Sequence, residues 1–108
     1  MKTLKFMPNL VPLVLSGEKT ATWRLWDDKD LQAGDTVSFL NSETRAEFAV
    51  ADLTKVKENK FKDLTKEDWS GHEKFKTDEE MYQSYSEAYG REVAPETPLK
   101  IVRFKLIS

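Results

Sequence analysis

The stretch SGEKTATWRLW (residues 16–26) begins with a turn signal and continues with a lysine, two threonines, an arginine and two tryptophans. Ser-Gly at its start marks a turn, and the Thr- and Trp-rich segment 20–26 predicts a strand. Because side chains alternate along a strand, Thr22, Arg24 and Trp26 would share one face, and Lys19 would join them only from the turn. The segment is therefore either one wall of a site or an ordinary exposed strand with solvated polar side chains.

The composition is that of a small, highly charged domain. The chain has 108 residues, of which 17 are Lys or Arg and 19 are Asp or Glu, for a net charge of -2. We expect residues 1–108 to form a single domain around one small core. The charge balance argues against a protein that holds long duplex nucleic acid by phosphate neutralisation. It leaves room for a local basic pocket that takes one nucleotide or a short single strand.

The residues that the chain lacks exclude several kinds of site. It has no cysteine and one histidine, so disulfides, thiolate nucleophiles and cysteine-type zinc sites are absent, and we expect neither a metal nor a cofactor. The first residues lack the continuous apolar run of a signal peptide, and no stretch approaches the ~20 apolar residues of a membrane span. We therefore expect a cytoplasmic monomer without a membrane partner.

Hydrophobic alternation and turn signals predict a fold built from short elements. Strands are expected at residues 2–7, 20–26, 36–40, 45–53 and 99–107, with a short helix at 10–16 and a longer one between Thr77 and Gly90. In strand 45–53, alternation places the apolar Ala46, Phe48 and Val50 on one face and the charged Arg45 and Glu47 on the other. The charged segment 58–77 is expected to be irregular apart from a helical turn after Thr65. This order, without a βαβ rhythm, predicts an α+β fold: a small, mostly antiparallel β-barrel with helices packed on it.

Two later segments hold further candidate site residues. In WSGHEKF (residues 69–75), the Glu73 carboxylate could pair with Lys19 or Arg24, or it could be solvated. We expect His72 to be a surface histidine and not a catalytic base. The longer helix carries an apolar and aromatic stripe, which we interpret as its buried face and not as a base-stacking platform. The stripe consists of Met81, Tyr82, Tyr85, Ala88 and Tyr89.

Taken together, these motifs resemble the ASCH-domain family, which belongs to the PUA-like barrel group. The family's hallmark is a Gly-x-Lys-x-x-Thr-x-Arg run after the first helix, and this chain has it complete. The matching residues are Gly17, Lys19, Thr22 and Arg24, followed by Gly34-Asp35, Glu73 and Tyr89-Gly90. The resemblance covers nearly the whole chain, and it implies a PUA-like barrel.

The resemblance also implies two alternative functions. Some small bacterial ASCH proteins of similar length are amidohydrolases that remove the acetyl group of N4-acetylcytidine. Their lysine, threonine and glutamate would here be Lys19, Thr22 and Glu73, with Arg24 and Trp26 holding the substrate. Thr22 would then be either the nucleophile, with Lys19 as its base, or a residue that only binds the substrate. In the alternative, the domain is a non-catalytic module that binds short single-stranded RNA, with cations on phosphates and a tryptophan stacked on a base.

Overall fold

Residues 1–107 are described in a computed structural model of the chain. Within them lie five strands, three α-helices and two 3-10 turns. In chain order these are β1 (Lys2–Phe6), η1 (Pro8–Leu10), α1 (Val11–Ser16), β2 (Ala21–Arg24), β3 (Thr36–Asn41), β4 (Glu47–Lys60), η2 (Phe61–Asp63), α2 (Lys66–Trp69), α3 (Asp78–Tyr89) and β5 (Pro98–Leu106). The predicted strands and helices are present. The segment 58–77 is more regular than expected, because β4 continues to its third residue.

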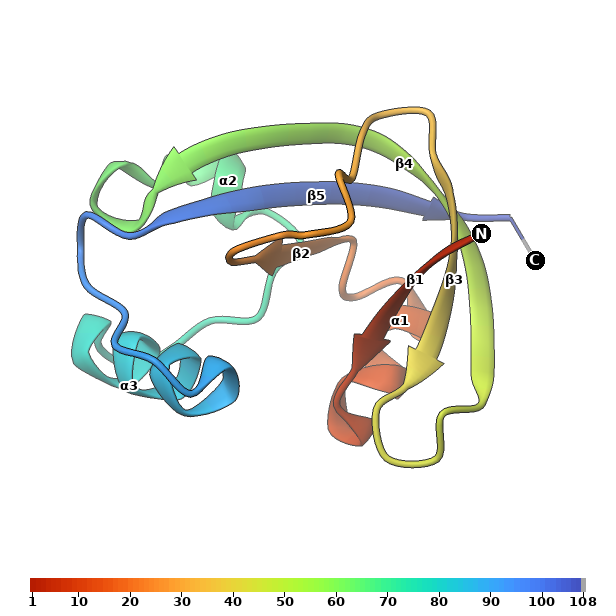
Figure 1. Cartoon of the computed structure of the whole chain (residues 1–108), viewed down its shortest axis with the longest axis horizontal. Coiled ribbons are helices and arrows are strands. Elements are labelled where there is room, and N and C mark those ends of the chain that lie inside the picture. Colours follow the sequence, from red (N-terminus) through yellow and green to blue (C-terminus); the bar gives the residue numbers. More distant parts are fainter. Residues whose placement is uncertain (108) are drawn as a thin grey trace.

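The five strands form one curled, half-barrel sheet with the order β1-β3-β4-β5-β2 (Figure 1). β1 runs parallel to β3, and the other neighbouring strands are antiparallel. Register shifts between Phe39 and Leu40 and between Leu53 and Lys55 interrupt the ladders on either side of β4. Irregularities of this kind increase the local twist, which lets the sheet curl. The predicted α+β fold with a mostly antiparallel sheet is confirmed.

The interior is divided into two hydrophobic clusters, where the sequence predicted one. The first core consists of Leu4, Phe6, Val14, Leu31, Val37, Phe39, Ala49, Ala51, Leu53, Val102 and Phe104. The second core consists of Trp23, Leu25, Phe61, Met81, Val93, Leu99 and Ile101. β5 contributes to both, because alternate side chains point to opposite faces of a strand. Its even-numbered buried residues pack in the first core and its odd-numbered ones in the second.

The face predicted to carry Ala46, Phe48 and Val50 is not the buried one. Ala49, Ala51 and Leu53 are the buried residues of this segment, whereas Ala46 is exposed and Phe48 is only partly buried. The three buried residues pack in the first core with a cluster of phenylalanine rings. Those rings belong to Phe6, Phe39 and Phe104, with centroids 4.7 to 6.4 Å apart. Phe48 reaches two of these rings as well, from a position that stays partly open to solvent.

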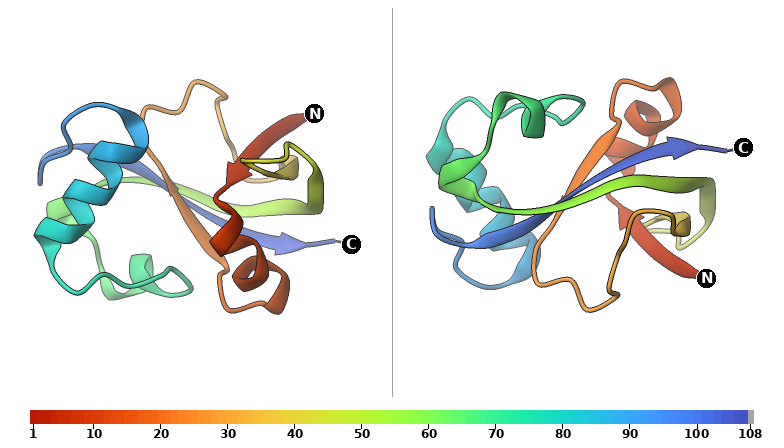
Figure 2. Two further views of the ribbon diagram at one scale, coloured as in Figure 1. Left: turned by 90° about the horizontal axis from the view of Figure 1, so that it is seen from below. Right: turned by 90° about the horizontal axis from the view of Figure 1, so that it is seen from above.

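α3 forms as predicted and lies at one end of the β4–β5 pair, with α1, β1 and β3 at the other (Figures 1 and 2). The Thr77 hydroxyl accepts a hydrogen bond from the backbone N–H of Glu80, and Gly90 ends the helix with φ 67°. Met81 is buried, and the three tyrosines of the stripe pack on the second core, which confirms these four residues as the inner face. Ala88, the fifth residue of the predicted stripe, is exposed. No helix within residues 1–107 is long and apolar enough to cross a membrane.

Candidate functional site

A cleft opens between the two ends of the molecule. β1 and η1 form one wall, α3 forms the other, and β2 lies between them. Its volume is about 240 Å³. The polar and charged side chains that line it are Lys5, Thr22, Arg24, Glu73, Ser84, Tyr85 and Tyr89. Three of these belong to the set predicted from the sequence, and they come from two segments about 50 residues apart.

Gly71 joins the two segments. Its carbonyl accepts hydrogen bonds from the backbone N–H groups of Thr20 at 2.9 Å and Ala21 at 3.2 Å. A Cβ atom at position 71 would lie 1.9 Å from Thr20 Oγ1, and the residue has φ 76°, so both sterics and backbone favour glycine here. The loop after α2 therefore packs directly on the start of β2. This contact places the next residues of the loop beside Lys19.

Lys19 and Glu73 form an ion pair in the wall of the cleft. Lys19 Nζ donates to Glu73 Oε2 at 2.5 Å and to the carbonyl of Ala21 at 2.8 Å. The Lys19 side chain is 2% exposed and that of Glu73 is 28% exposed. Glu73 therefore faces the cleft, and the ammonium of Lys19 lies behind it. The predicted pairing of Glu73 with a cation of the first motif is thus found with Lys19.

Burial and charge shift both groups of this pair. Burial lowers the pKa of the Lys19 ammonium; Glu73 opposes this shift, and Arg24 adds to it. Burial by itself would raise the pKa of Glu73, but attraction to His72 and Lys19, together with the hydrogen bond from Lys19, leaves it below its usual value. Glu73 is therefore a carboxylate at neutral pH, while Lys19 releases its proton more readily than an exposed lysine does.

His72 is buried, so its predicted surface position is wrong. Its ring stacks on Trp23 with centroids 3.8 Å apart and an interplanar angle of 14°. Nδ1 lies 2.8 Å from the Glu73 carbonyl oxygen, and Nε2 lies 3.2 Å from the Tyr85 hydroxyl. Burial and the nearby Lys19 lower the pKa of His72 to about 4, so the imidazole is neutral at pH 7. The large flat ring of Trp23, from the core face of β2, supplies the surface that covers it.

Thr22 and Arg24 both line the cleft from β2. Thr22 is 5% exposed, and its hydroxyl has no hydrogen-bond partner within residues 1–107. Arg24 Nη2 donates to the Lys5 carbonyl at 2.9 Å, and the guanidinium lies 4.9 Å from the centre of the Phe6 ring. Burial lowers the pKa of Arg24, partly offset by Tyr89, Tyr85 and Glu73. Its Nε is buried and has no hydrogen-bond partner within residues 1–107, so the guanidinium keeps donor capacity for a ligand.

Trp26 is the predicted site residue that lies apart from the others. β2 ends at Arg24, and Trp26 has φ 48°, so the strand face that was predicted to carry both does not extend this far. The indole packs edge-on against Tyr89 and is covered by the Arg91 guanidinium, 3.8 Å from the ring centre. Trp26 lines an adjoining hollow of about 190 Å³, which shares Lys5, Arg24 and Tyr89 with the cleft.

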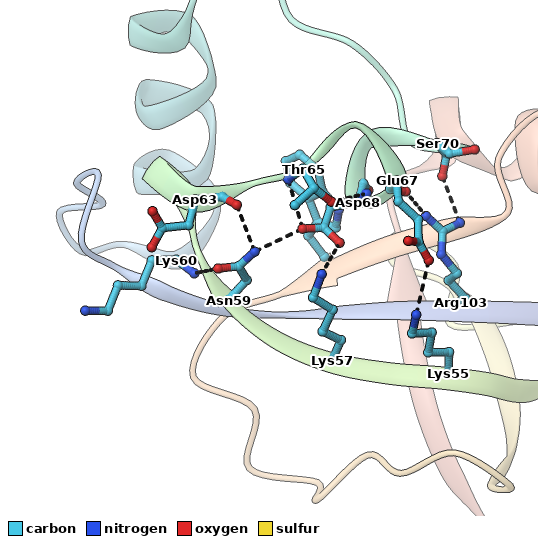
Figure 3. A network of polar contacts seen from close by, with 11 residues as sticks. Lys55, Lys57, Asn59, Lys60, Asp63, Thr65, Glu67, Asp68, Ser70 and Arg103 are labelled. Carbon is cyan, nitrogen blue, oxygen red and sulfur yellow. Dashed lines mark hydrogen bonds and ion pairs between the residues drawn. The ribbon is translucent and has the colours of Figure 1, made fainter.

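A polar network outside the cleft holds α2, and with it the loop that carries Glu73 (Figure 3). The buried Asp68 carboxylate accepts hydrogen bonds from Lys57 Nζ at 2.9 Å and from Asn59 Nδ2 and the Thr65 backbone N–H at 3.0 Å. Arg103 of β5 donates to the carbonyls of Glu67 and Ser70. These contacts fix both α2 and the residue before Gly71 on strands β4 and β5.

The sequence anticipated Lys19, Thr22, Arg24 and Glu73 at one site, but it missed His72 and Tyr85. For Tyr85, the sequence signal was the aromatic stripe of α3. This stripe is the inner face of the helix, and it directs Tyr85 toward the loop that carries His72. Within residues 1–107, His, Asp and Glu side chains do not gather in threes that could hold a metal ion. Over the part of the chain that the structure describes, the site thus offers a threonine hydroxyl without a partner, a glutamate paired with a buried lysine, and a guanidinium with free donor capacity.

Comparisons with known proteins agree with this fold. The family model of the ASCH domain matches residues 2–108. The crystal structure of an Enterococcus faecalis protein superposes with a TM-score of 0.76 at 23% identity, over 92% of this chain and 70% of that one. The ASCH domain from Lactobacillus crispatus gives 0.61 at 18% identity, over 91% and 70%. The solution structure of a Pyrococcus furiosus protein gives 0.67 at 17% identity, over 99% and 97%. None of the curated proteins matches significantly.

Proposed function

The chain belongs to the ASCH-domain family, and from that premise we propose that it is an amidohydrolase for N4-acetylcytidine or a related N-acylated pyrimidine nucleoside. One observation carries the proposal. Glu73, which is paired with the buried Lys19, lines the same cleft of about 240 Å³ as Thr22, whose hydroxyl has no partner within residues 1–107. Small-molecule sites usually measure ~300–1,000 Å³, so a single nucleoside suits this cleft better than a longer ligand.

Hydrolysis would begin with attack of Thr22 Oγ1 on the acyl carbonyl carbon. In our proposal the proton held between Lys19 and Glu73 moves to the carboxylate, which leaves a neutral amine to accept the Thr22 proton. Their 2.5 Å separation allows this transfer; the lowered pKa of Lys19 favours it, and the lowered pKa of Glu73 opposes it. Glu73 then gives its proton to the exocyclic nitrogen as the C–N bond breaks. Water hydrolyses the acyl ester on Thr22 and releases the carboxylic acid.

Two further side chains have proposed roles in holding the substrate. Arg24 would donate to the acyl carbonyl oxygen, where negative charge develops as Thr22 attacks. Its Nε, which has no hydrogen-bond partner within residues 1–107, suits such a donor. Trp26 would contact the part of the substrate that extends into the adjoining hollow, which meets the cleft at Arg24.

The experiment is a hydrolysis assay on N4-acetylcytidine that measures cytidine release. We expect turnover by the wild type and a loss of at least about a thousandfold in kcat for Thr22→Ala, because the nucleophile is removed. Thr54→Ala is the matched control, since Thr54 is an exposed threonine on β4 far from the lining of the cleft. Wild-type turnover no faster than the uncatalysed reaction would disprove the proposal.

A double mutant tests whether Thr22 and Lys19 act as one unit. If Lys19 is the base for Thr22, Lys19→Ala should lower kcat strongly, and adding Thr22→Ala should lower it scarcely further. Losses that multiply would instead mean that the two residues contribute independently, and they would remove the lysine from the proposed proton path.

The second candidate is a non-catalytic module for short single-stranded RNA, favoured by the two cations of the cleft, Lys5 and Arg24. α3 counts against it, because this wall begins with Asp78, Glu79 and Glu80. An RNA titration at two salt concentrations separates the candidates. RNA binding would weaken with salt as counterions are released, and Thr22→Ala would cost no more than one hydrogen bond, ~0.5–1.5 kcal/mol.

A further inference from the structure

We propose that His72 and Tyr85 are positioning residues of the site: Tyr85 orients the His72 ring, and His72 holds Glu73 on Lys19. Neither residue was expected at the site. The structural part of this inference stands on contacts alone, and its catalytic consequence rests on the proposed amidohydrolase function.

The hydrogen bonds of His72 fix which nitrogen carries its proton. Nδ1 lies 2.8 Å from the carbonyl oxygen of Glu73, which can only accept, so Nδ1 must be the protonated nitrogen. The imidazole is neutral at pH 7, which leaves a lone pair on Nε2. The Tyr85 hydroxyl, whose pKa burial raises well above 10, therefore donates to Nε2. Tyr85 of α3 thus donates a hydrogen bond to the imidazole, and the imidazole donates one to the backbone carbonyl of Glu73.

This arrangement holds the backbone of the loop on both sides of the Glu73 Cα. Ahead of it, the carbonyl of Gly71 is bound by two N–H groups at the start of β2. Behind it, the carbonyl of Glu73 is held by the His72 ring, which is itself pressed against Trp23 at 3.8 Å. The ring also lies close to the carboxylate, with Nδ1 3.6 Å from Oε2. Glu73 thus reaches Lys19 from a restrained backbone, which reduces the entropy lost in holding the catalytic geometry.

His72 is not placed to touch the substrate. It is 6% exposed, and it does not line the cleft, whereas Glu73 and Tyr85 do. Its effect would therefore pass through Glu73. A positioning role predicts that its loss lowers kcat with little change in KM, because the carboxylate is misplaced while the binding surface stays intact.

The first experiment is nitrogen NMR of the imidazole at pH 7, which needs no turnover. The chain has one histidine, so its ring signals are unambiguous. We expect the Nδ1-protonated tautomer in the wild type and a changed Nε2 shift in Tyr85→Phe, which loses only the hydroxyl. Tyr82→Phe is the matched control: Tyr82 lies on the same helix and packs on Phe61, away from the cleft lining. A proton on Nε2, or no response to Tyr85→Phe, overturns the inference.

The second experiment is the kinetics of the same variants on N4-acetylcytidine. We expect kcat to fall about tenfold in Tyr85→Phe with KM within about twofold, and no change in Tyr82→Phe. His72→Gln should retain at least about tenfold more kcat than His72→Leu, because a glutamine amide can both donate to the Glu73 carbonyl and accept from Tyr85. An effect on KM alone, or equal losses in both His72 variants, contradicts the positioning role. If the wild type shows no turnover but His72 has the expected tautomer, the proposed amidohydrolase function is disproved, while the proposed Tyr85–His72–Glu73 contacts still stand.

Discussion

The first and second cores share strand β5, yet they differ in chemistry. The first consists of aliphatic side chains and phenylalanines, with ring centroids as close as 4.7 Å. The second contains or contacts the tryptophans and tyrosines, and buried polar residues adjoin it. His72 stacks on Trp23, and the backbone carbonyl of Asp68 lies 3.4 Å from the Trp23 indole nitrogen. Apolar packing stabilises one end, while the other combines packing with hydrogen bonds that hold a site.

This difference suggests a division of labour. Burial of apolar surface is non-directional and tolerates no polar group without a partner, so the first core suits stability. Tryptophan and tyrosine combine large apolar area with a polar atom, so they can cover an ionisable side chain and also bond to it. We therefore expect substitutions in the first core to change mainly the free energy of unfolding. Those around the cleft should change stability less and should make it depend on pH.

The largest expected loss of stability comes from the first core. Phe39→Ala removes a fully buried ring that contacts Phe6, Phe48 and Phe104, and it should lower the free energy of unfolding by about 3–5 kcal/mol. Urea denaturation measures this. Phe48→Ala is the control, because the partly buried Phe48 should cost clearly less. Equal losses would mean that the first core is not tightly packed around residue 39.

The next effect is acid destabilisation of the second core through His72. Its pKa is about 4 in the folded chain and 6.5 as the ordinary value, so the unfolded chain binds more protons between these pH values. Stability should therefore fall as pH drops from about 6.5 to 4, by about 3 kcal/mol. His72→Gln should show a flatter curve over this window, measured by denaturation at a series of pH values. Parallel curves for the two proteins would show that His72 is not buried as a neutral ring.

A smaller effect is expected from the network that holds α2. Asp68→Asn removes the charge that Lys57, Asn59 and the Thr65 N–H share, and it should cost about 2 kcal/mol, since hydrogen bonds to a charged group contribute ~1.5–3 kcal/mol. Asp63→Asn is the matched control, because the Asp63 side chain is exposed. Thermal or urea unfolding at pH 7 compares the two. A loss in Asp63→Asn as large as in Asp68→Asn would contradict the role assigned to this network.

The smallest change of stability is expected at Thr22, where the effect on activity is largest. Its hydroxyl has no partner within residues 1–107, so Thr22→Ala removes no hydrogen bond and should change the free energy of unfolding by less than about 1 kcal/mol. The same urea curves provide the measurement, with Thr54→Ala beside it. A loss of several kcal/mol would make Thr22 a structural residue and would weaken any interpretation of its kinetics.

Local patterns in the sequence predicted the elements well and the burial less well. The glycines at 17 and 90 end α1 and α3 with positive φ, as expected. The predicted inner face of α3 also agreed for Met81 and the three tyrosines. A helix that packs on only one side buries a single stripe, so the apolar stripe identifies the buried side. The pattern of strand 45–53 did not identify the buried side, because alternation defines two faces without saying which of them is buried. β5 shows the same limit, since its two faces pack in different cores.

By itself, the sequence determined the order of the elements, the turn before β2 and the residue types available for a site, because these depend on neighbours a few positions away. Only the tertiary structure decided that Lys19 meets Glu73, which is 54 positions distant. That contact requires a residue without a side chain at position 71, where Thr20 packs closely, together with the anchoring of α2 through Asp68 and the curl of the sheet. It also decided that His72 is buried. In the sequence, a single histidine beside charged residues looks like a surface residue. It is buried because Trp23 and Tyr85 contact it, and those contacts depend on how β2 and α3 pack.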